Sequence, residues 1–315
     1  MNNGRIKHKG RLRQIPIYLG KMFRMFIYVS DWKVLPMSAI IAVLVAKVAA
    51  QNMFLTMEGT IFGALALACI CVWNGFFNSI QVVCRERAIV KREHRDGMHI
   101  SSYVCAHVIY QAFLCLCQTI ITVYVCKLAG IQFPTKGFVT DYFMVDISIT
   151  VFLTTFAADM MSLMISCMAK NTTSAMTIMP FVLIFELLFS GSMFELSGFA
   201  NKLTDLSIAK WAINCFCAQA NYNGLPMVAL WNKAKSFTET VEFKGEYPLK
   251  EIMNYLANNG YANDITMWMG QHNQNEAYAT TLRNIGSCWI NLLVFAVLFI
   301  VIAVVALELV DKDKR

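Results

Sequence analysis

Apolar residues dominate six long stretches of this chain, and short polar stretches separate them. The apolar stretches are residues 34–50, 59–83, 101–128, 138–168, 174–194 and 285–309. The hydrocarbon core of a bilayer is about 30 Å thick, and a helix crosses it in about 20 residues. Lipid offers the backbone no hydrogen-bond partner, so a chain inside it must be helical or form a closed barrel. The pattern therefore predicts an all-α integral membrane protein with six transmembrane helices.

The strongest polar interruption lies at residues 84–103, which read CRERAIVKREHRDGMHISSY. Charged side chains recur there at helical spacing, with Arg87 and Lys91 four residues apart. Such a segment must lie in water or among lipid headgroups, and its Lys and Arg residues mark the cytoplasmic side by the positive-inside rule. We therefore expect a cytoplasmic interfacial helix at residues 85–97, ended by Gly97, and both chain termini in the cytoplasm.

The other polar stretches predict the remaining parts of the fold. Residues 1–31 interleave basic residues with aromatic and aliphatic ones, which is typical of an amphipathic helix on an anionic membrane surface. Residues 195–220 are too polar to span a bilayer and too apolar for a free loop, so they predict re-entrant helices in the outer leaflet. Residues 221–283 have a soluble composition and predict a small external domain. The first five spans would then occupy residues 32–220, and the last span with its cytoplasmic tail residues 284–315.

The composition agrees with a multi-pass membrane protein. Of the 315 residues, 57% are hydrophobic and 15% are charged, against about a quarter charged in a soluble domain. The net charge of +7 reflects Lys and Arg at the two ends and in the polar loop, so it indicates topology and no nucleic-acid partner. The eleven cysteines lie almost wholly in apolar stretches, where thiols behave as small hydrophobes, and their spacing predicts no metal site.

Two acidic residues lie inside the apolar stretches, Asp159 in the fourth and Glu186 in the fifth. A charge in hydrocarbon is costly unless it is paired or faces water, so each of these residues is a functional candidate. For Glu186 the sequence leaves open a place in a substrate path and a role in helix packing, and it favours packing. Gly59 and Gly63 have the spacing that lets two helices approach closely, although incidental small residues would look the same.

Three motifs resemble one family of transporters. Residues 86–103 match the pattern E-R-x-x-x-x-R-E-x-x-x-G-M-x-x-S of the first cytoplasmic loop of G-subfamily ABC transporters, the white and pleiotropic-drug-resistance group. Residues 189–191, Phe-Ser-Gly, precede a polar stretch that ends at residues 218–222, AQANY, which is similar to the family's ALxxNEF ending. A weaker match is Gly-Glu-Tyr at residues 245–247, ahead of an Asn-Gly pair. Residues 20–310 thus resemble an ABC-2 type membrane domain.

The resemblance implies an export permease that dimerises around a central path and is coupled to an ATPase through residues 85–97. The alternative for that segment is a solvated cytoplasmic loop whose basic residues reflect the positive-inside rule and which has no coupling role. Carried over by position, the family's coupling residues are Glu86, Arg87, Arg92 and Glu93. The residues that would line the substrate path are Asn74, Phe77, Ile184 and Leu187. The outer gate would lie at Ser192 and Met193, where the family has paired leucines.

No G-x-x-x-x-G-K-[ST] motif occurs, so the sequence shows no phosphate-binding loop of its own. The resemblance implies that ATP and Mg²⁺ bind a nucleotide-binding ATPase partner, either a separate subunit or a domain that normally precedes this chain, and that this chain binds no cofactor itself. The expected function is a non-enzymatic permease, a homodimer or heterodimer in the plasma membrane, that exports a hydrophobic or amphipathic drug, peptide or lipid. The alternative is a non-transporting membrane scaffold or sensor with a ligand-binding external domain. An ATPase gene beside this one would favour transport.

Overall fold

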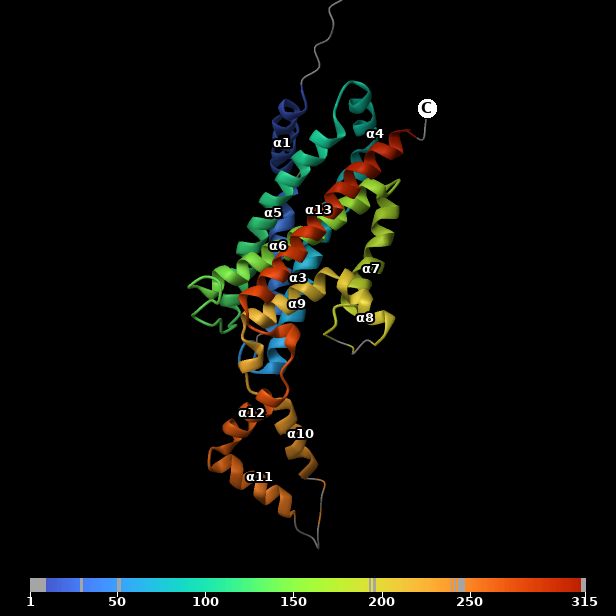
Figure 1. Ribbon diagram of the computed structural model, residues 1–315. Coiled ribbons are helices and arrows are strands. Elements are labelled where there is room, and N and C mark those ends of the chain that lie inside the picture. Colours follow the sequence, from blue (N-terminus) through green and yellow to red (C-terminus); the bar gives the residue numbers. More distant parts are fainter. Residues whose placement is uncertain are drawn as a thin grey trace, which may run out of the picture.

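The computed structural model describes residues 10–28, 31–49, 52–192, 194, 197–238, 240, 242 and 247–312. Within these residues every regular element is a helix (Figure 1). The long apolar helices are α2 (Val34–Ala49), α3 (Met57–Ser79), α5 (Ile100–Leu128), α6 (Phe143–Met168), α7 (Thr172–Leu188) and α13 (Leu282–Lys312). One of these helices lies in each of the six predicted spans.

The six apolar helices differ in length. Four stretches of the described chain are long and apolar enough to cross a membrane. They are the nearly continuous helical stretch from Met57 to Arg95, which begins with α3, then α5, α6, and α13 as far as Leu309. The helices α2 and α7 have 16 and 17 residues. At 1.5 Å per residue they reach about 24 to 26 Å, which is shorter than the hydrocarbon core. The structure therefore confirms an all-helical fold with several apolar helices of membrane-spanning length.

The central helix of the bundle is α6, which packs most extensively against α3 and α13. Its small residues Ala157 and Ala158 are fully buried, and α3 approaches it closely at Gly75. A Cβ atom on Gly75 would lie 2.5 Å from the carbonyl oxygen of Thr155, so only glycine fits there. The predicted pair of small residues has another role, because a Cβ at Gly63 would meet the Met53 side chain of the preceding turn and not a second helix.

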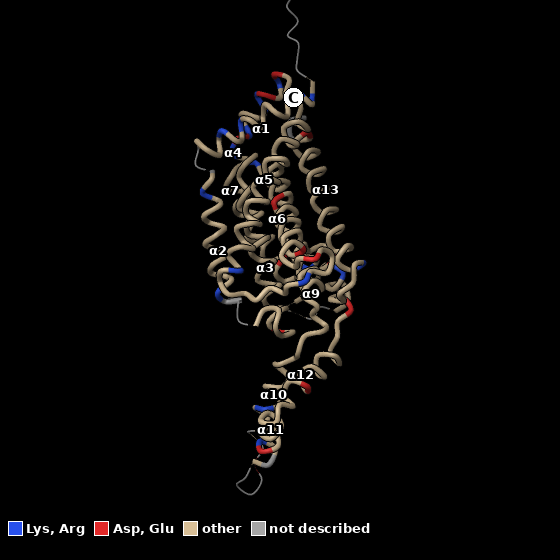
Figure 2. Tube along the Cα trace, turned by 90° about the vertical axis from the view of Figure 1, so that its left-hand side faces the viewer, with Lys and Arg blue, Asp and Glu red and all other residues tan. Residues whose placement is uncertain are grey.

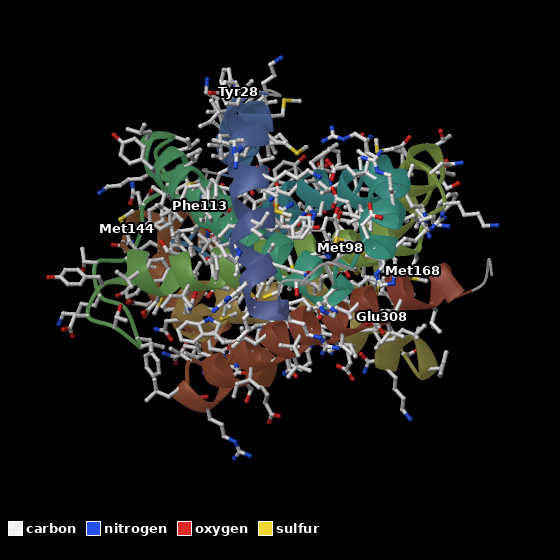
Figure 3. The ribbon with its side chains drawn as sticks, turned by 90° about the horizontal axis from the view of Figure 1, so that it is seen from above. Tyr28, Met98, Phe113, Met144, Met168 and Glu308 are labelled. Atoms are coloured by element: carbon white, nitrogen blue, oxygen red, sulfur yellow. The ribbon has the colours of Figure 1, made fainter. Side chains whose placement is uncertain are left out.

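The two ends of the bundle carry different structures. At one end lie α1 (Arg11–Tyr28), α4 (Val82–Arg95) and the end of α13 (Figure 1). Seen from above, α1 crosses the bundle, with Tyr28 at the edge of the view (Figure 3). At the opposite end lie α8 (Phe199–Leu203) and α9 (Ile208–Gln219), and beyond them a separate lobe. The helices of that lobe are α10 (Val228–Thr238), α11 (Pro248–Asn258) and α12 (Tyr261–His272).

Two boundaries differ from the hydropathy pattern. The fourth helix begins at Phe143 and not at 138, because Asp146 folds the preceding residues into a loop. Its carboxylate accepts hydrogen bonds from the backbone N–H groups of Phe138, Val139 and Thr140, each at 2.9 Å. The interfacial helix α4 begins at Val82, three residues earlier than predicted. Its end agrees with the prediction, since Gly97 follows it with a left-handed φ of 105°.

Candidate coupling region and transport path

The first turn of α4 is fixed to the end of α6. The hydroxyl of Ser166 accepts hydrogen bonds from the backbone N–H groups of Val83 and Cys84, at 3.1 and 3.2 Å. The first N–H groups of a helix have no partner within the helix, and the N-cap residue Gln81 supplies none from its side chain. A serine from another helix therefore caps α4. This contact could not be predicted from the sequence, because Ser166 lies 82 and 83 positions away from its two partners in the chain.

Arg87 strengthens the same junction. Its guanidinium donates to the carbonyl oxygen of Cys167 at 3.4 Å and to that of Ala169. These carbonyl groups lie at the C-terminal end of α6, where the helix leaves acceptors unpaired and its dipole favours a cation. Arg87 thus ties α4 to the turn that connects α6 with α7.

The opposite side of α4 is attached to α1. The Glu86 carboxylate accepts from the Lys21 ammonium at 3.0 Å, and this ion pair is mostly shielded from solvent on the Glu86 side. Two helical turns further along α4, Glu93 lies close to Tyr18. Burial and the nearby Glu93 carboxylate together raise the pKa of the Tyr18 hydroxyl to about 12. The acidic residues Glu86 and Glu93 are seven positions apart and therefore share one face of the helix.

A second connection joins α1 to the segment after α4. The Gln14 side-chain amide donates to the carbonyl oxygen of Gly97 at 3.1 Å and accepts from the backbone N–H of His99 at 2.9 Å. Of the four predicted coupling residues, three therefore make contacts between helices, whereas Arg92 is exposed. Gln14 was missed in the sequence because it lies in the basic N-terminal stretch, where only charge and amphipathicity were informative.

Asp159 lies at the meeting point of three helices in the middle of the bundle, and its side chain is fully buried. Its carboxylate accepts from the Asn78 amide at 3.2 Å, from the Ser79 hydroxyl and from the Cys115 thiol at 3.3 Å. Asn78 in turn exchanges two hydrogen bonds of 2.9 Å with Gln118. The costly intramembrane charge thus has polar partners on α3 and α5.

Glu186 also makes polar contacts, at the end of α7. Its Oε2 atom accepts from the hydroxyl of Ser207 at 2.8 Å and from the backbone N–H of Ala209 at 2.9 Å. The carboxylate therefore lies at the N-terminus of α9, where the helix dipole favours a negative charge. This contact holds the first turn of α9 against the last turn of α7.

Replacing Glu186 by alanine should lower the thermal stability of the purified chain more than replacing it by glutamine. Alanine leaves the buried N–H of Ala209 without an acceptor, and such a loss costs about 1–3 kcal/mol. Glutamine keeps one acceptor oxygen, so its effect should be about half as large. Melting of both variants in detergent checks this. Unchanged stability with loss of transport in Glu186→Gln would instead place the charge in a substrate path.

The predicted path residues divide between two cavities. An apolar cavity of about 530 Å³ lies between α2, α3 and α7, and its walls include Ile184, Leu187 and Trp73. Phe77 lines a second cavity of about 340 Å³ near α1, α4 and α5. Asn74 lines neither cavity, and its buried amide nitrogen has no hydrogen-bond partner among the described residues. Ile184 and Leu187 thus line one cavity and Phe77 lines the other, although the Phe77 ring packs against Trp73 of the first cavity with the ring centroids 5.8 Å apart.

The second cavity is unusual because one face of α5 carries polar groups without partners. Tyr103, His107 and Gln111 line this cavity at intervals of four residues. The Tyr103 hydroxyl, both His107 ring nitrogens and both Gln111 side-chain polar atoms make no hydrogen bond within the described part of the chain. The four-residue spacing of these polar residues was visible in the sequence and could have identified them.

The predicted gate is described only in part. Ser192 follows α7 and its hydroxyl lies 3.1 Å from that of Ser190. Met193 lies outside the described residues. Across the described ranges, no three His, Cys, Asp or Glu side chains gather as metal ligands would.

A bundle of long apolar helices, with an interfacial helix held between α1 and α6, defines a multi-pass membrane protein. The chain belongs to the ABC-2 type transporter family, whose model matches residues 15–219. Over 147 residues it is 29% identical to the ABC transporter ATP-binding/permease protein Rv1747 of Mycobacterium tuberculosis. That stretch covers 44% of this chain and 16% of the relative, so the chain spans a small part of that protein's length. The family is one of membrane domains that normally pair with an ATP-binding domain.

Proposed function

We propose that this chain is the permease of an ATP-driven exporter of the G-subfamily type and moves a hydrophobic or amphipathic compound across the plasma membrane. The observation that carries the proposal is the attachment of α4 on both sides. Glu86 holds it to α1 at 3.0 Å, and Arg87 and Ser166 hold it to α6. A force applied to α4 would therefore reach several spans together. The apolar cavity beside Ile184 and Leu187 supports a substrate with apolar surface.

The proposal requires two partners. ATP and Mg²⁺ would bind a nucleotide-binding ATPase domain or subunit that docks on α4, with Arg92 exposed for that contact. A second copy of the permease, or a related one, would complete the path by covering the exposed faces of α3 and α7. Phe77 and Ile184 are 45% and 53% exposed on these helices, and an apolar surface is stable against lipid or against another helix.

A reconstitution experiment tests the function. The chain and its ATPase partner are placed together in lipid vesicles, and ATP hydrolysis is measured with a panel of amphipathic compounds. A transported compound should raise hydrolysis and should accumulate on one side of the vesicle membrane. Hydrolysis that no compound alters, together with no accumulation, would contradict the proposal.

Labelling of cysteines should show α4 in the cytoplasm and the lobe of α10 to α12 outside. The prediction follows from the Lys and Arg residues of α1 and α4 at one end of the bundle (Figure 2). Arg95→Cys and Lys235→Cys are suitable because both side chains are exposed. In a variant without native cysteines, a membrane-impermeant reagent should label position 235 in intact cells and position 95 only after lysis. The reverse result would overturn this topology.

One observation favours the alternative function of a sensor with a ligand-binding external domain. The helices α11 and α12 form an open, mostly apolar groove of about 400 Å³, lined by Leu256, Tyr261, Asp264, Ile265 and Trp268. Trp268 is 59% exposed, and its ring packs against that of His272 with the ring centroids 4.0 Å apart. If deletion of the lobe abolishes a ligand response but leaves transport intact, the lobe is a sensor added to a transporter. If no transport is found with any ATPase partner, the scaffold or sensor function is favoured.

A further inference from the structure

A basic pocket lies between α4 and the turn that joins α6 to α7. It has a volume of about 540 Å³ and is open to the surroundings. Four of its lining residues are cationic, and no Asp or Glu lines it. The lining residues are Cys84, Arg85, Arg87, Ala88, Lys91, Lys170, Asn171 and Thr172. The pocket therefore presents a concentrated positive charge to any ligand that enters it.

The acidic residues of α4 do not neutralise this charge. Glu86 is paired with Lys21, and Glu93 lies beside Tyr18, so both face α1 on the other side of the helix. Arg87 is engaged by carbonyl groups at the end of α6, which leaves its positive charge in place. Arg85 and Lys170 are exposed and make no ion pair within the described residues. The pocket thus keeps at least two cations available for an external anion.

The beginning of α7 adds a second source of positive potential. Thr172, its first residue, lines the pocket, and the side chain of Asn171 caps the helix by accepting from the Ser174 N–H at 2.8 Å. The other first-turn N–H groups of a helix lack partners within it, and the helix dipole favours an anion at this end. Phosphate groups commonly bind at helix N-termini for this reason. The combination of cations and helix terminus points to a phosphate rather than to a neutral ligand.

The depth of the pocket indicates where the phosphate comes from. The 23 residues of α3 are about 34 Å long, which places the following helix α4 at the level of lipid headgroups. Beyond Thr172, toward the middle of the bundle, α7 exposes the apolar residues Met176 and Pro180, which lie four and eight positions further along the helix. Met168, at the end of α6, is 56% exposed and lies toward the edge of the bundle (Figure 3). An anionic pocket ligand would therefore have an apolar surface directly beside it.

We propose that this pocket binds the phosphate headgroup of an anionic membrane phospholipid, whose acyl chain lies along Met176 and Pro180 of α7. Basic pockets between helices at a membrane surface are suited to such headgroups. An acidic surface of the ATPase partner would match the charge but would make no use of the exposed apolar residues Met176 and Pro180 beside the pocket. The bound lipid would brace α4 against α7 at the junction that Arg87 and Ser166 already form.

The experiment measures lipid binding by the purified chain without nucleotide or ATPase, so it does not depend on the proposed transport function. The chain in detergent is titrated with a short-chain phosphatidylglycerol, with phosphatidylcholine of the same acyl chains and with inorganic phosphate. Retained lipid is counted by mass spectrometry, and melting is followed in parallel. The variant Arg85→Gln/Lys170→Gln removes two exposed cations that make no ion pair within the described residues. The control variant Lys202→Gln/Lys235→Gln removes two exposed cations at the opposite end of the fold.

The chain should retain phosphatidylglycerol in preference to phosphatidylcholine. In Arg85→Gln/Lys170→Gln the affinity for phosphatidylglycerol should fall about tenfold or more, whereas the control variant should match the unmodified chain. Equal retention of both lipids, or an unchanged affinity in Arg85→Gln/Lys170→Gln, would overturn the proposal. Stabilisation by inorganic phosphate equal to that by phosphatidylglycerol would identify a free phosphate site instead.

Discussion

Replacing Arg87 by alanine in the assembled transporter should lower transport about tenfold or more while ATP hydrolysis continues. The Arg87 guanidinium donates to the carbonyl oxygens of Cys167 and Ala169. Hydrogen bonds to charged groups contribute about 1.5–3 kcal/mol each, and 1.4 kcal/mol corresponds to a factor of ten. Loss of these bonds would loosen α4 from the junction of α6 and α7 without changing the exposed face of α4. Transport and hydrolysis measured in the same vesicles give the ratio that tests coupling.

Three further variants make this result specific. Arg87→Lys should have an intermediate effect, because a single ammonium group lacks the planar fork that reaches two carbonyl groups. Ser166→Ala should also lower the coupling ratio, since it removes the acceptor for Val83 and Cys84 from the other side of the junction. Arg95→Ala removes an exposed cation at the end of α4 and should stay within about twofold of the unmodified protein. Equal decreases in transport and hydrolysis for Arg87→Ala would contradict the coupling role.

The helices themselves could be predicted, because a chain in lipid must satisfy all of its backbone hydrogen bonds internally and a long apolar stretch does so as a helix. Each of the six apolar stretches contains a helix, and α4 ends just before Gly97 as expected. The ends of the helices were less predictable where a side chain, and not the helix backbone, accepts hydrogen bonds from backbone N–H groups. Asp146 fixes three N–H groups of residues 138–140, so an apolar stretch that reads as helix begins as a loop. Such a cap depends on local geometry that hydropathy does not contain.

The partners of the charged residues could not be predicted. Asp159 and Glu186 were conspicuous as charges in apolar sequence, but their partners lie far along the chain. Asn78 and Ser79 are 81 and 80 positions from Asp159, and Ser207 is 21 positions from Glu186. Which polar residues meet across helices depends on the helix packing, which periodicity alone leaves open. For the same reason the sequence grouped Phe77 with Ile184 and Leu187, although the structure places these residues on separate cavities.

The buried network around Asp159 should be the most sensitive part of the bundle. Asn78, Ser79 and Cys115 all donate to this one carboxylate. If the carboxylate were removed, the Ser79 hydroxyl and the Cys115 thiol would lose their acceptor, whereas the Asn78 amide would keep its hydrogen bond to Gln118. A buried donor left without an acceptor costs about 1–3 kcal/mol, and here more than one donor is affected. That amount is a large fraction of the total stability of a typical domain.

Asp159→Leu should therefore reduce the yield of folded protein strongly and lower its melting temperature. Asp159→Asn should lower the melting temperature less, because the remaining carbonyl oxygen can still accept from Ser79. Some loss is expected, because the new amide nitrogen is a donor that faces the donors Asn78 and Cys115. A matched control is Asp205→Asn, since Asp205 is an exposed carboxylate and its pair with Lys210 should contribute little. Melting of the purified variants and transport per folded molecule are measured together. If Asp159→Asn melts like the unmodified protein but transports nothing, then Asp159 acts on the substrate path, and the structural role argued from its three donors is wrong.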